Sequence, residues 1–232
     1  MINRIINKKI RKTLFKGKAI ILMGCRQIGK TTSLNEIFSV ENDVLWLSGD
    51  DSDTRDLFEN ITSDRLKTIF GNKKIIVIDE AQRIADVGLK LKLITDNIKD
   101  LQLVATGSSA FELADKTKES LTGRKREFQM YPLSFKEMVE HHGFITERRL
   151  LQHRLVYGYY PEVVTNPGDE KLILKSLSDS YLYKDVLALD YIKKSDKLIK
   201  LLQALAYQIG SQVSYNELSQ IVGVDSKTIE KY

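Results

Sequence analysis

The 232-residue chain has a single cysteine and no hydrophobic run that approaches the roughly 20 residues of a membrane-spanning helix. A lone cysteine excludes a framework of intramolecular disulfides and favours a reducing compartment. Residues 1–10 lack the apolar segment of a secretory signal. We therefore expect a cytoplasmic protein with no membrane partner.

The signatures of several enzyme classes are missing as well. The three histidines and the cysteine show neither an H-E-x-x-H motif nor a zinc-binding spacing, so we predict no zinc site built by protein ligands. The absence of a G-x-S-x-G elbow argues against an α/β-hydrolase. The acidic stretch 49–53 lacks the spacing of a calcium loop, and we interpret it as a turn that leads into a helix cap.

The remaining composition is that of an ordinary soluble globular protein, with 42% hydrophobic and 29% charged residues. The length is sufficient for one or two domains with a sizeable core. A net charge of +5 and an isoelectric point near 9.0 favour, weakly, an anionic partner such as nucleic acid.

The strongest functional motif lies between Ile20 and Thr32. Its residues from Gly24 to Thr31 match G-x-x-x-x-G-K-[ST] at every fixed position. An apolar run precedes the loop and helical spacing follows it, which is the strand, loop and helix context that phosphate binding requires. A glycine loop that merely turns the chain does not account for this context. We predict a phosphate-binding loop whose backbone N–H groups and helix N-terminus are directed at the anion.

Within this loop, Lys30 is predicted to contact the β- and γ-phosphates, and the Thr31 hydroxyl to ligate Mg²⁺. Cys25 is either a small side chain that fills a loop position or a site of thiol modification. The residues predicted to bind ATP or ADP are Gly24, Cys25, Arg26, Gln27, Ile28, Gly29, Lys30, Thr31 and Thr32.

A second informative stretch runs from Lys74 to Arg83. Four β-branched residues precede Asp79 and Glu80, a pattern typical of a buried strand that ends at an active edge. Because ligands bind beyond the carboxyl ends of parallel strands, Asp79 is predicted to hold Mg²⁺, directly or through water. Glu80 is predicted to accept a proton from, or to orient, the water that attacks the γ-phosphate. The alternative interpretation is that Asp79 and Glu80 are ordinary surface acids at the end of a strand. The phosphate loop upstream favours the interpretation that they take part in hydrolysis.

A strand expected at 101–106 ends in polar residues. Thr106 or Ser108 would hydrogen-bond the γ-phosphate or the attacking water. Ser108 or Ser109 would equally cap the helix that follows, and the two interpretations are compatible.

A short basic run, Leu121–Arg126, precedes an expected fifth strand at 127–131. Arg124 is the first candidate there to neutralise charge on the transferred phosphoryl group, because Gly123 would let its backbone approach closely. Contact with nucleic acid or with solvent are the alternatives for this arginine.

The helical segments suggest three domains. Residues 1–145 are predicted to form the P-loop core, 146–209 a small helical domain and 210–232 a separate helix-turn-helix segment. Residues 2–15 read as a basic amphipathic helix, which we expect to dock its apolar face on its own domain; a membrane or DNA surface is the alternative.

Residues 214–232 resemble a helix-turn-helix, with Gly223 at the turn, Val224 as a core plug and Asp225 or Ser226 as the cap of the second helix. The apolar face of the first helix is predicted to consist of Leu218, Ile221 and Val222. The exposed recognition positions would be Ser226, Lys227, Thr228 and Lys231. Contact with DNA and contact with another protein are both compatible with this pattern. The chain ends inside the second helix, so we expect the natural protein to continue.

Five ordered motifs resemble those of prokaryotic AAA-type ATPases of the archaeal and STAND-like branch, and the resemblance covers nearly the whole chain. It implies an α/β fold with a P-loop NTPase core, a parallel five-stranded sheet of order 5-1-4-3-2, a helical lid and a partial winged helix. The motifs are GxRQxGKTT at 24–32, DEAQR at 79–83, TGSS at 106–109, GR and YPLSF at 123–124 and 131–135, and a PEVV turn at 158–164.

The same resemblance assigns phosphate and Mg²⁺ to Lys30 and Thr31, the metal to Asp79, the attacking water to Glu80 and a sensor function to Ser108. Many members of the family have Pro or Ala at the position of Cys25, and we expect the cysteine to be tolerated there. Its members usually continue into a restriction-endonuclease-like domain of unknown function. None of that domain is expected here, so a nuclease role is outside what this chain performs alone.

The leading hypothesis is a Mg²⁺-dependent ATPase whose cycle moves the helical and winged-helix parts, on DNA or on another partner. The alternative is a nucleotide-gated switch that holds ATP or ADP tightly and rarely hydrolyses it. A small-molecule kinase is disfavoured because no dedicated acceptor pocket is evident. The sequence leaves open whether the chain forms a homo-oligomer in which an arginine acts on a neighbouring subunit's nucleotide.

Overall fold

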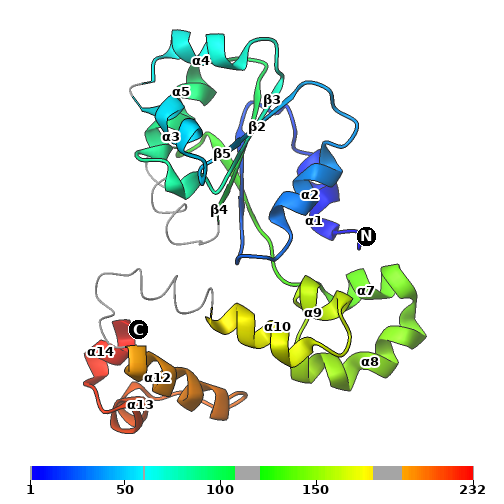
Figure 1. Cartoon of the computed structure of the whole chain (residues 1–232), viewed down its shortest axis with the longest axis vertical. Coiled ribbons are helices and arrows are strands. Elements are labelled where there is room, and N and C mark those ends of the chain that lie inside the picture. Colours follow the sequence, from blue (N-terminus) through cyan, green and yellow to red (C-terminus); the bar gives the residue numbers. More distant parts are fainter. Residues whose placement is uncertain (1, 60, 108–120, 180–194, 232) are drawn as a thin grey trace. The chain divides into compact units, whose positions relative to one another are not determined.

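The computed structural model describes residues 2–59, 61–107, 121–179 and 195–231. The chain divides into two compact units, Met1–Gly168 and Asp169–Tyr232, which are drawn in Figure 1 and are described separately below. The three-part division expected from the sequence, at 145 and 209, remains a prediction.

A five-stranded parallel sheet forms the centre of the first unit. Its order is β2-β3-β4-β1-β5, which confirms the expected order 5-1-4-3-2 counted from the opposite edge. All four strand pairs are parallel. The strands are β1 (Ala19–Met23), β2 (Val44–Ser48), β3 (Ile75–Asp79), β4 (Gln102–Gly107) and β5 (Lys125–Gln129).

Helices cover both faces of this sheet, as Figure 1 shows. One face packs against α1 and α2, and the other packs against α3, α4 and α5. Parallel strands require crossover connections, and helices in those connections shield both faces of the sheet from water. These helices are α1 (Ile5–Arg11), α2 (Lys30–Ile37), α3 (Ser52–Phe58), α4 (Ser63–Phe70) and α5 (Val87–Asn97).

The alternation of side chains along β1 builds both core layers at once. Ile20 and Leu22 belong to the layer that contains α1 and α2, whereas Ala19, Ile21 and Met23 belong to the opposite layer. Every residue of β1 and of β4 is buried, as expected for central strands that are covered on both faces. The continuous apolar runs that mark these strands in the sequence follow from this two-sided burial.

The N-terminal helix docks on its own unit, which confirms the favoured interpretation of the basic amphipathic segment. Ile10 is fully buried in the layer that contains α2, and Ile6 and Leu14 pack against that layer. Lys8 and Lys9 are exposed. The apolar stripe therefore serves the core of this unit.

Three helices follow the sheet in the first unit: α7 (Phe135–His142), α8 (Phe144–Tyr157) and α9 (Pro161–Thr165). α7 begins with a capping box formed by Ser134 and Glu137, which satisfies backbone N–H groups of the first turn. The N–H of Leu133 donates to the carbonyl of Tyr159 at 2.9 Å, so the chain that leaves the sheet is tied to the turn between α8 and α9.

A buried carboxylate holds these helices together. Glu147 of α8 is fully buried; it accepts a hydrogen bond from the Tyr159 hydroxyl at 2.6 Å and lies 2.7 Å from His142 Nε2. Burial first, and then the bond to Glu147, raises the pKa of Tyr159 to about 12. Tyr159 therefore keeps its proton and its donor role at neutral pH.

In the described residues of the second unit, all regular secondary structure is helical. α12, α13 and α14 share a small core of Leu201, Ala204, Leu218, Val222 and Ile229. The helices among its described residues are α10 (Glu170–Leu177), α12 (Ser195–Tyr207), α13 (Tyr215–Val222) and α14 (Ser226–Lys231).

The helix-turn-helix pattern is largely confirmed in α13 and α14. Gly223 adopts the left-handed conformation at φ 71°, Val224 packs against the small core, and the Asp225 carboxylate accepts the N–H of Thr228 at 3.0 Å. Ile221 is 53% exposed, so its assignment to the buried face is wrong: positions 218 and 222 are one turn apart and already fill that face. Residues 195–231 contain no strand, and the wing remains a prediction.

The edge strand β5 was expected at 127–131 and lies two residues earlier. Its first residue, Lys125, pairs with Ala19 at the start of β1. Lys125 and Phe128 of this edge strand are half-buried and its other three residues are exposed, so the strand provides no continuous apolar run. Hydrophobicity alone therefore located this strand poorly.

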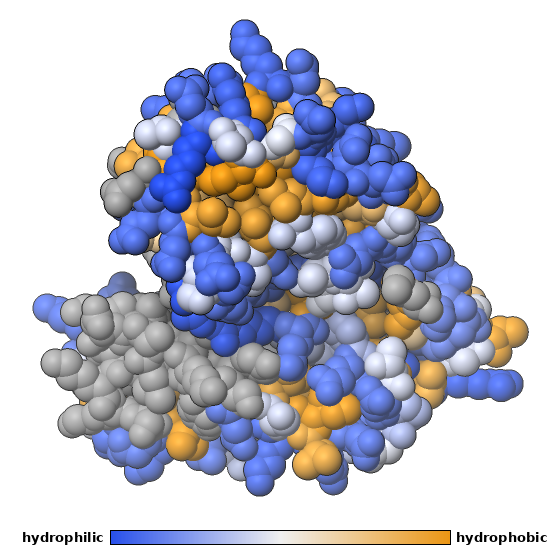
Figure 2. All heavy atoms as spheres, turned by 45° about the horizontal axis from the view of Figure 1, so that its top comes forward, coloured by the Kyte–Doolittle hydropathy of each residue, from blue (hydrophilic) through white to orange (hydrophobic). Residues whose placement is uncertain are grey.

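Most of the face drawn in Figure 2 is hydrophilic, with a band of hydrophobic side chains across its upper part. This distribution agrees with a charged content of 29%. In the described part of the chain, no helix is both long and apolar enough to cross a membrane.

Candidate functional site

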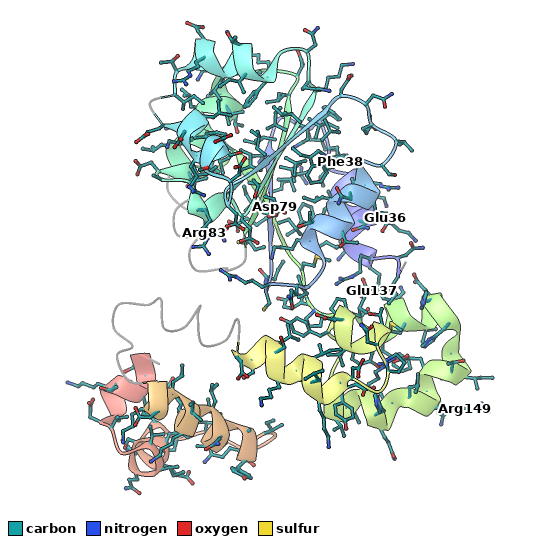
Figure 3. The ribbon with its side chains drawn as sticks, in the orientation of Figure 1. Glu36, Phe38, Asp79, Arg83, Glu137 and Arg149 are labelled. Carbon is teal, nitrogen blue, oxygen red and sulfur yellow. The ribbon has the colours of Figure 1, made fainter. Side chains whose placement is uncertain are left out.

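Three neighbouring strands end at the same edge of the sheet because all of them are parallel. β1 leads into the loop 24–29 and β3 ends at Asp79, while β4, which lies between them, ends with Thr106 and Gly107. Asp79 is labelled at the end of its strand in Figure 3. Open parallel sheets bind their ligands beyond this carboxyl edge.

The loop that connects β1 to α2 contains two positions where glycine is required. A Cβ atom at Gly24 would lie 2.6 Å from the carbonyl oxygen of Met130, because the chain that leaves β5 passes directly over the loop. Gly29 has φ 94° and ψ 26°, a left-handed conformation that favours glycine, and α2 begins immediately after it. Ile28, between them, is buried in the core at 1% exposure. The loop is therefore anchored on its inner side and open on its outer side.

Lys30 points back across the loop. Its Nζ donates to the carbonyl oxygens of Gly24 at 2.9 Å and Cys25 at 3.1 Å. Burial lowers the pKa of Lys30, and the nearby carboxylates of Glu80 and Asp79 act in the opposite direction. This arrangement places a desolvated cation at the mouth of the loop, where an anionic ligand would be a better partner than two carbonyl groups.

A hydrogen-bond network joins α2, β3 and β4 at this edge. The Thr31 hydroxyl donates to Oδ2 of Asp79 at 2.7 Å. Oδ1 of Asp79 accepts the hydroxyl of Thr106, which is fully buried, and the N–H of Glu80 at 3.1 Å. Asp79 is therefore fixed by hydrogen bonds from α2 and from β4. The Thr31 hydroxyl binds one of its carboxylate oxygens, and the Thr106 hydroxyl binds the other.

Glu80 has an unusual backbone conformation for a residue with a side chain, at φ 48° and ψ 42°. Such a conformation typically costs about 1–3 kcal/mol and persists only where the surroundings stabilise it. Here the Glu80 N–H is held by Asp79 and by the Thr106 hydroxyl at 3.2 Å. Gln82 then donates its side-chain amide to Oε2 of Glu80 at 2.5 Å, which orients the carboxylate.

The loop and Glu80 enclose one cavity of about 300 Å³. The sequence predicted that the phosphate loop and the acidic strand end would meet, and the structure brings them together here. The residues that line this cavity are Gln27, Gly29, Lys30, Thr31, Thr32 and Glu80.

A second cavity of about 270 Å³ shares Gly29 and Thr32 with the first and is mainly apolar. The N-terminal segment, the loop, α2 and the helices α7 and α9 all contribute to its wall; Glu36 of α2, labelled in Figure 3, is among the contributors. Its apolar lining comes mainly from Ile2, Ile28, Leu133 and Pro161.

Tyr160 connects the loop to this helical wall. A hydrogen bond joins its hydroxyl to the Cys25 side chain, and burial is the first cause that raises the pKa of Tyr160 to about 12. Tyr160 directly precedes Pro161, the first residue of α9. The position of α9 is therefore coupled to the outer turn of the loop.

One of the predicted catalytic residues, Arg124, is not in this arrangement. Arg124 precedes β5, and its carbonyl accepts the N–H of Ala19 at the start of β1, so it lies at the amino edge of the sheet, about 15 Å of strand from the loop. Its guanidinium pairs with Asp96 at 2.5 Å. This corrects the expectation that Arg124 would reach phosphates bound in the cavity of its own chain. Ser108 lies outside the described residues.

Sequence reasoning missed three features of the site. Gln82 belongs to the DEAQR motif, yet it was given no role, and its contact with Glu80 depends on the turn at residue 80. Arg4 belongs to the basic residues of the N-terminal amphipathic segment and was given no role of its own, whereas it is 9% exposed and contacts the loop. The apolar cavity combines residues from four distant segments, and no local pattern signals it.

The residues at the first cavity fit a Mg²⁺ ion bound together with phosphates. The Thr31 hydroxyl and the Asp79 carboxylate are adjacent oxygen ligands, and Mg²⁺ usually retains several waters and needs only one or two protein carboxylates. Over the described residues, no group of three or more His, Cys, Asp or Glu side chains could hold a metal by itself. A metal at this edge would therefore depend on ligand phosphates.

The fold and the loop define a P-loop NTPase of the AAA type. Residues 16–139 match an AAA domain family, and the chain belongs to that family. Residues 148–232 match a domain of unknown function (DUF8612), which extends across the boundary between the two compact units.

The chain is also similar to curated proteins and to solved structures, of which three examples follow. Uncharacterised protein MJ1544 of Methanocaldococcus jannaschii is 23% identical over 94% of this chain and 53% of its own length. An uncharacterised protein of Haemophilus influenzae is 30% identical over 75% of this chain and 44% of its own length. The Walker-type ATPase PABY2304 of Pyrococcus abyssi superposes with a TM-score of 0.51 at 18% identity, covering 100% of this chain and 89% of that one. The chain spans about half the length of these curated relatives, and the structural likeness concerns the fold.

The contact between Gly24 and Met130 yields a prediction. Gly24→Ala forces a methyl group against a backbone carbonyl that cannot rotate away, so we expect the loop or the strand exit to shift and the free energy of unfolding to fall by about 1–3 kcal/mol. Urea unfolding followed by the fluorescence of Trp46, the only tryptophan, measures this in the sheet unit.

Gly123→Ala is the matched control, because its Cβ would meet nothing within 4 Å and only the cost of φ 76° remains, about 1 kcal/mol. Equal stability of the Gly24→Ala variant and the unsubstituted protein would contradict the close approach of Met130.

Proposed function

We propose that this chain is a Mg²⁺-dependent ATPase that binds ATP between the loop 24–29 and the ends of β3 and β4. The observation that supports this most is the meeting of Lys30, Thr31, Asp79 and Glu80 at the edge of one cavity. A loop that only bound phosphate would not need a second carboxylate held beside the first one by its own hydrogen bonds.

In the proposed reaction, water attacks the γ-phosphorus, and the bond to the β–γ bridging oxygen breaks to leave ADP and phosphate. Glu80 accepts a proton from the attacking water or orients it, in a position maintained by Gln82. Lys30 exchanges its two carbonyl partners for phosphate oxygens and neutralises the charge of the triphosphate. Backbone N–H groups at the start of α2 add to this stabilisation.

Thr31 and Asp79 are the residues that would hold Mg²⁺, Thr31 directly and Asp79 directly or through water. When bound, the ion supplies neutralisation of charge on the phosphate oxygens. Thr106 keeps the Asp79 carboxylate in one orientation, which favours a single coordination geometry.

The mainly apolar second cavity is the proposed site of the nucleotide base. It adjoins the phosphate cavity through Gly29 and Thr32, as a base joined to its phosphates requires. Apolar walls with a few polar groups suit a flat heteroaromatic ring. Because α9 contributes to the wall, base binding would also depend on the position of this helix.

A nucleotide-gated switch with little turnover is the second candidate. It is favoured by the contact that joins the loop to the turn before α9, from Tyr160 to Cys25, and by the bond from Leu133 to Tyr159, which ties the chain beyond β5 to the same turn. Such contacts would let bound nucleotide change the helical part without repeated hydrolysis.

DNA is a proposed partner of the second unit, through α13 and α14. The support is a helix, a glycine turn and a second, capped helix, with Lys227 exposed. We expect a labelled DNA duplex to bind in a salt-dependent manner, measured by fluorescence anisotropy, and Lys227→Glu to weaken binding. Lys200→Glu, on the exposed side of α12, is the control; equal binding by both variants would remove this proposal.

Assembly into a homo-oligomer also remains a proposal, and the size of the particle with and without an ATP analogue tests it.

Two substitutions separate binding from hydrolysis. Glu80→Gln removes the proton acceptor but keeps the shape of the side chain, so we expect ATP turnover to fall by about 100-fold or more while ATP affinity changes by less than about threefold. Lys30→Ala removes the cation from the loop, and we expect the affinity for a fluorescent ATP analogue to fall by about tenfold or more. Steady-state phosphate release and equilibrium titration measure the two effects.

Glu140→Gln, an exposed carboxylate on α7, is the control for both measurements. Equal turnover of the unsubstituted protein and Glu80→Gln, with and without DNA, would reject the enzyme. Nucleotide that remains bound through purification, together with negligible turnover, would instead support the switch.

Filling the apolar cavity tests the base site separately. Thr165→Trp introduces a large ring into its wall, so we expect ATP affinity to fall by about tenfold while affinity for inorganic triphosphate is unchanged. Thr165→Ser is the control, and competition titrations against the fluorescent analogue provide the comparison. A parallel loss of both affinities would place the effect in the phosphate loop and not in a base site.

A further inference from the structure

Arg4 makes three hydrogen bonds to three separate segments of the first unit. Its Nη1 donates to the carbonyl of Ile28 at 2.9 Å, its Nη2 to the carbonyl of Tyr131 at 2.5 Å, and its Nε to Oε1 of Glu137 at 3.1 Å. The side chain is 8% exposed, and that of Glu137 is 6% exposed. One buried guanidinium therefore joins the phosphate loop, the chain that leaves the sheet and the first turn of α7.

Glu137 is equipped to hold this arginine. Its carboxylate also accepts the N–H of Ile5 at 2.8 Å and the N–H of Ser134 at 2.8 Å. Burial acts to raise the pKa of Glu137, but these two backbone bonds and the charge of Arg4 outweigh it, so the pKa lies below its usual value. The pair is therefore ionised at neutral pH, and Glu137 lies at the start of α7, as labelled in Figure 3.

The bond to Ile28 acts on a peptide group of the phosphate loop. The peptide between Ile28 and Gly29 is planar and trans, so its carbonyl and its N–H point to opposite sides. Fixing the Ile28 carbonyl on Arg4 directs the Gly29 N–H away from Arg4, and Gly29 lines the phosphate cavity. Rotation of this peptide changes ψ of Ile28 and φ of Gly29, and Gly29, at φ 94°, has no side chain that would restrict such a rotation.

We propose that Arg4 is a positioning residue that holds the Ile28–Gly29 peptide in its anion-binding orientation and ties the loop to α7. The effect on nucleotide affinity rests on the proposed function; the effect on loop geometry does not. Arg4 lies outside residues 16–139, the segment that matches the AAA domain family.

The planar guanidinium group of arginine is essential to this role. A guanidinium donates in several fixed directions at once, whereas a lysine ammonium is a compact point charge on a flexible stem. Arg4→Lys keeps a charge beside Glu137, which protects the fold, but cannot reproduce the three bonds. Arg4→Met removes both the charge and the hydrogen-bond donors of the guanidinium group.

The single cysteine of the chain reports the state of the loop without any nucleotide. Cys25 is exposed and lies inside the loop, so its rate of alkylation by a maleimide depends on loop conformation. We expect this rate, normalised to that of the denatured chain, to rise by about threefold or more in Arg4→Met and in Arg4→Lys, because a released loop samples open conformations more often. Arg11→Met is the matched control, since Arg11 donates only an exposed bond, to the Glu36 carbonyl, and we expect no change.

Nucleotide affinity is the second measurement. We expect the dissociation constant of the fluorescent ATP analogue to rise by about tenfold in both Arg4 variants and to stay unchanged in Arg11→Met. Circular dichroism and the unfolding midpoint of Arg4→Lys establish that the variant is folded during both assays.

An unchanged alkylation rate in folded Arg4→Lys would overturn the positioning role, whatever the nucleotide data show. A raised rate in Arg11→Met equal to that in Arg4→Lys would overturn it as well, because the effect would then belong to the N-terminal helix as a whole. If the unsubstituted protein fails to bind the analogue, the proposed function falls, while the alkylation rates still decide the role of Arg4.

Discussion

The site depends on one carboxylate, that of Asp79, which is held between two hydroxyl groups from different elements. Thr31 approaches it from the helix that follows the phosphate loop, and Thr106 approaches it from the end of the strand between β1 and β3. This is possible only in a parallel sheet in which β4 separates β1 from β3, because the three strand ends then meet at one edge. The left-handed turn at Glu80 is stabilised by the same groups, so the second carboxylate takes its direction from the first.

The surroundings of the loop come from outside the sheet. The N-terminal segment, the chain beyond β5 and the start of α7 converge on the loop through Arg4 and Glu137, and the turn before α9 reaches it through Tyr160. These contacts explain why the first compact unit extends to Gly168 and includes α7, α8 and α9. Of the described helices in 146–209, the segment expected to act as a lid, α8 and α9 belong to the same unit as the sheet, and α10 and α12 belong to the second unit.

Much of the fold could be predicted from the chain itself. The buried strands β1 and β3 are marked by continuous apolar runs, and β4 by its apolar centre at 103–105. The sheet order follows the family resemblance, and the N-terminal helix docks on its own unit, as its apolar stripe indicated. The predictions that failed concern weakly patterned positions. β5 is an edge strand with little apolar content, and Ile221 lies beside a face that Leu218 and Val222 already fill. Arg124 was chosen for its charge and its glycine neighbour, and neither feature says at which edge of the sheet a residue lies.

By itself, the sequence determined the local chemistry of this protein: a glycine loop with a lysine and a threonine at its end, and two acids after a buried strand. Those features depend on residues close together in the chain, where spacing alone decides geometry. Only the tertiary structure decided which side of the loop is anchored, which groups orient Asp79 and Glu80, and that Arg4 is buried against the loop. Arg4 and Glu137 are separated by 133 positions, and a contact over such a distance is created by packing and leaves no periodic trace in the sequence.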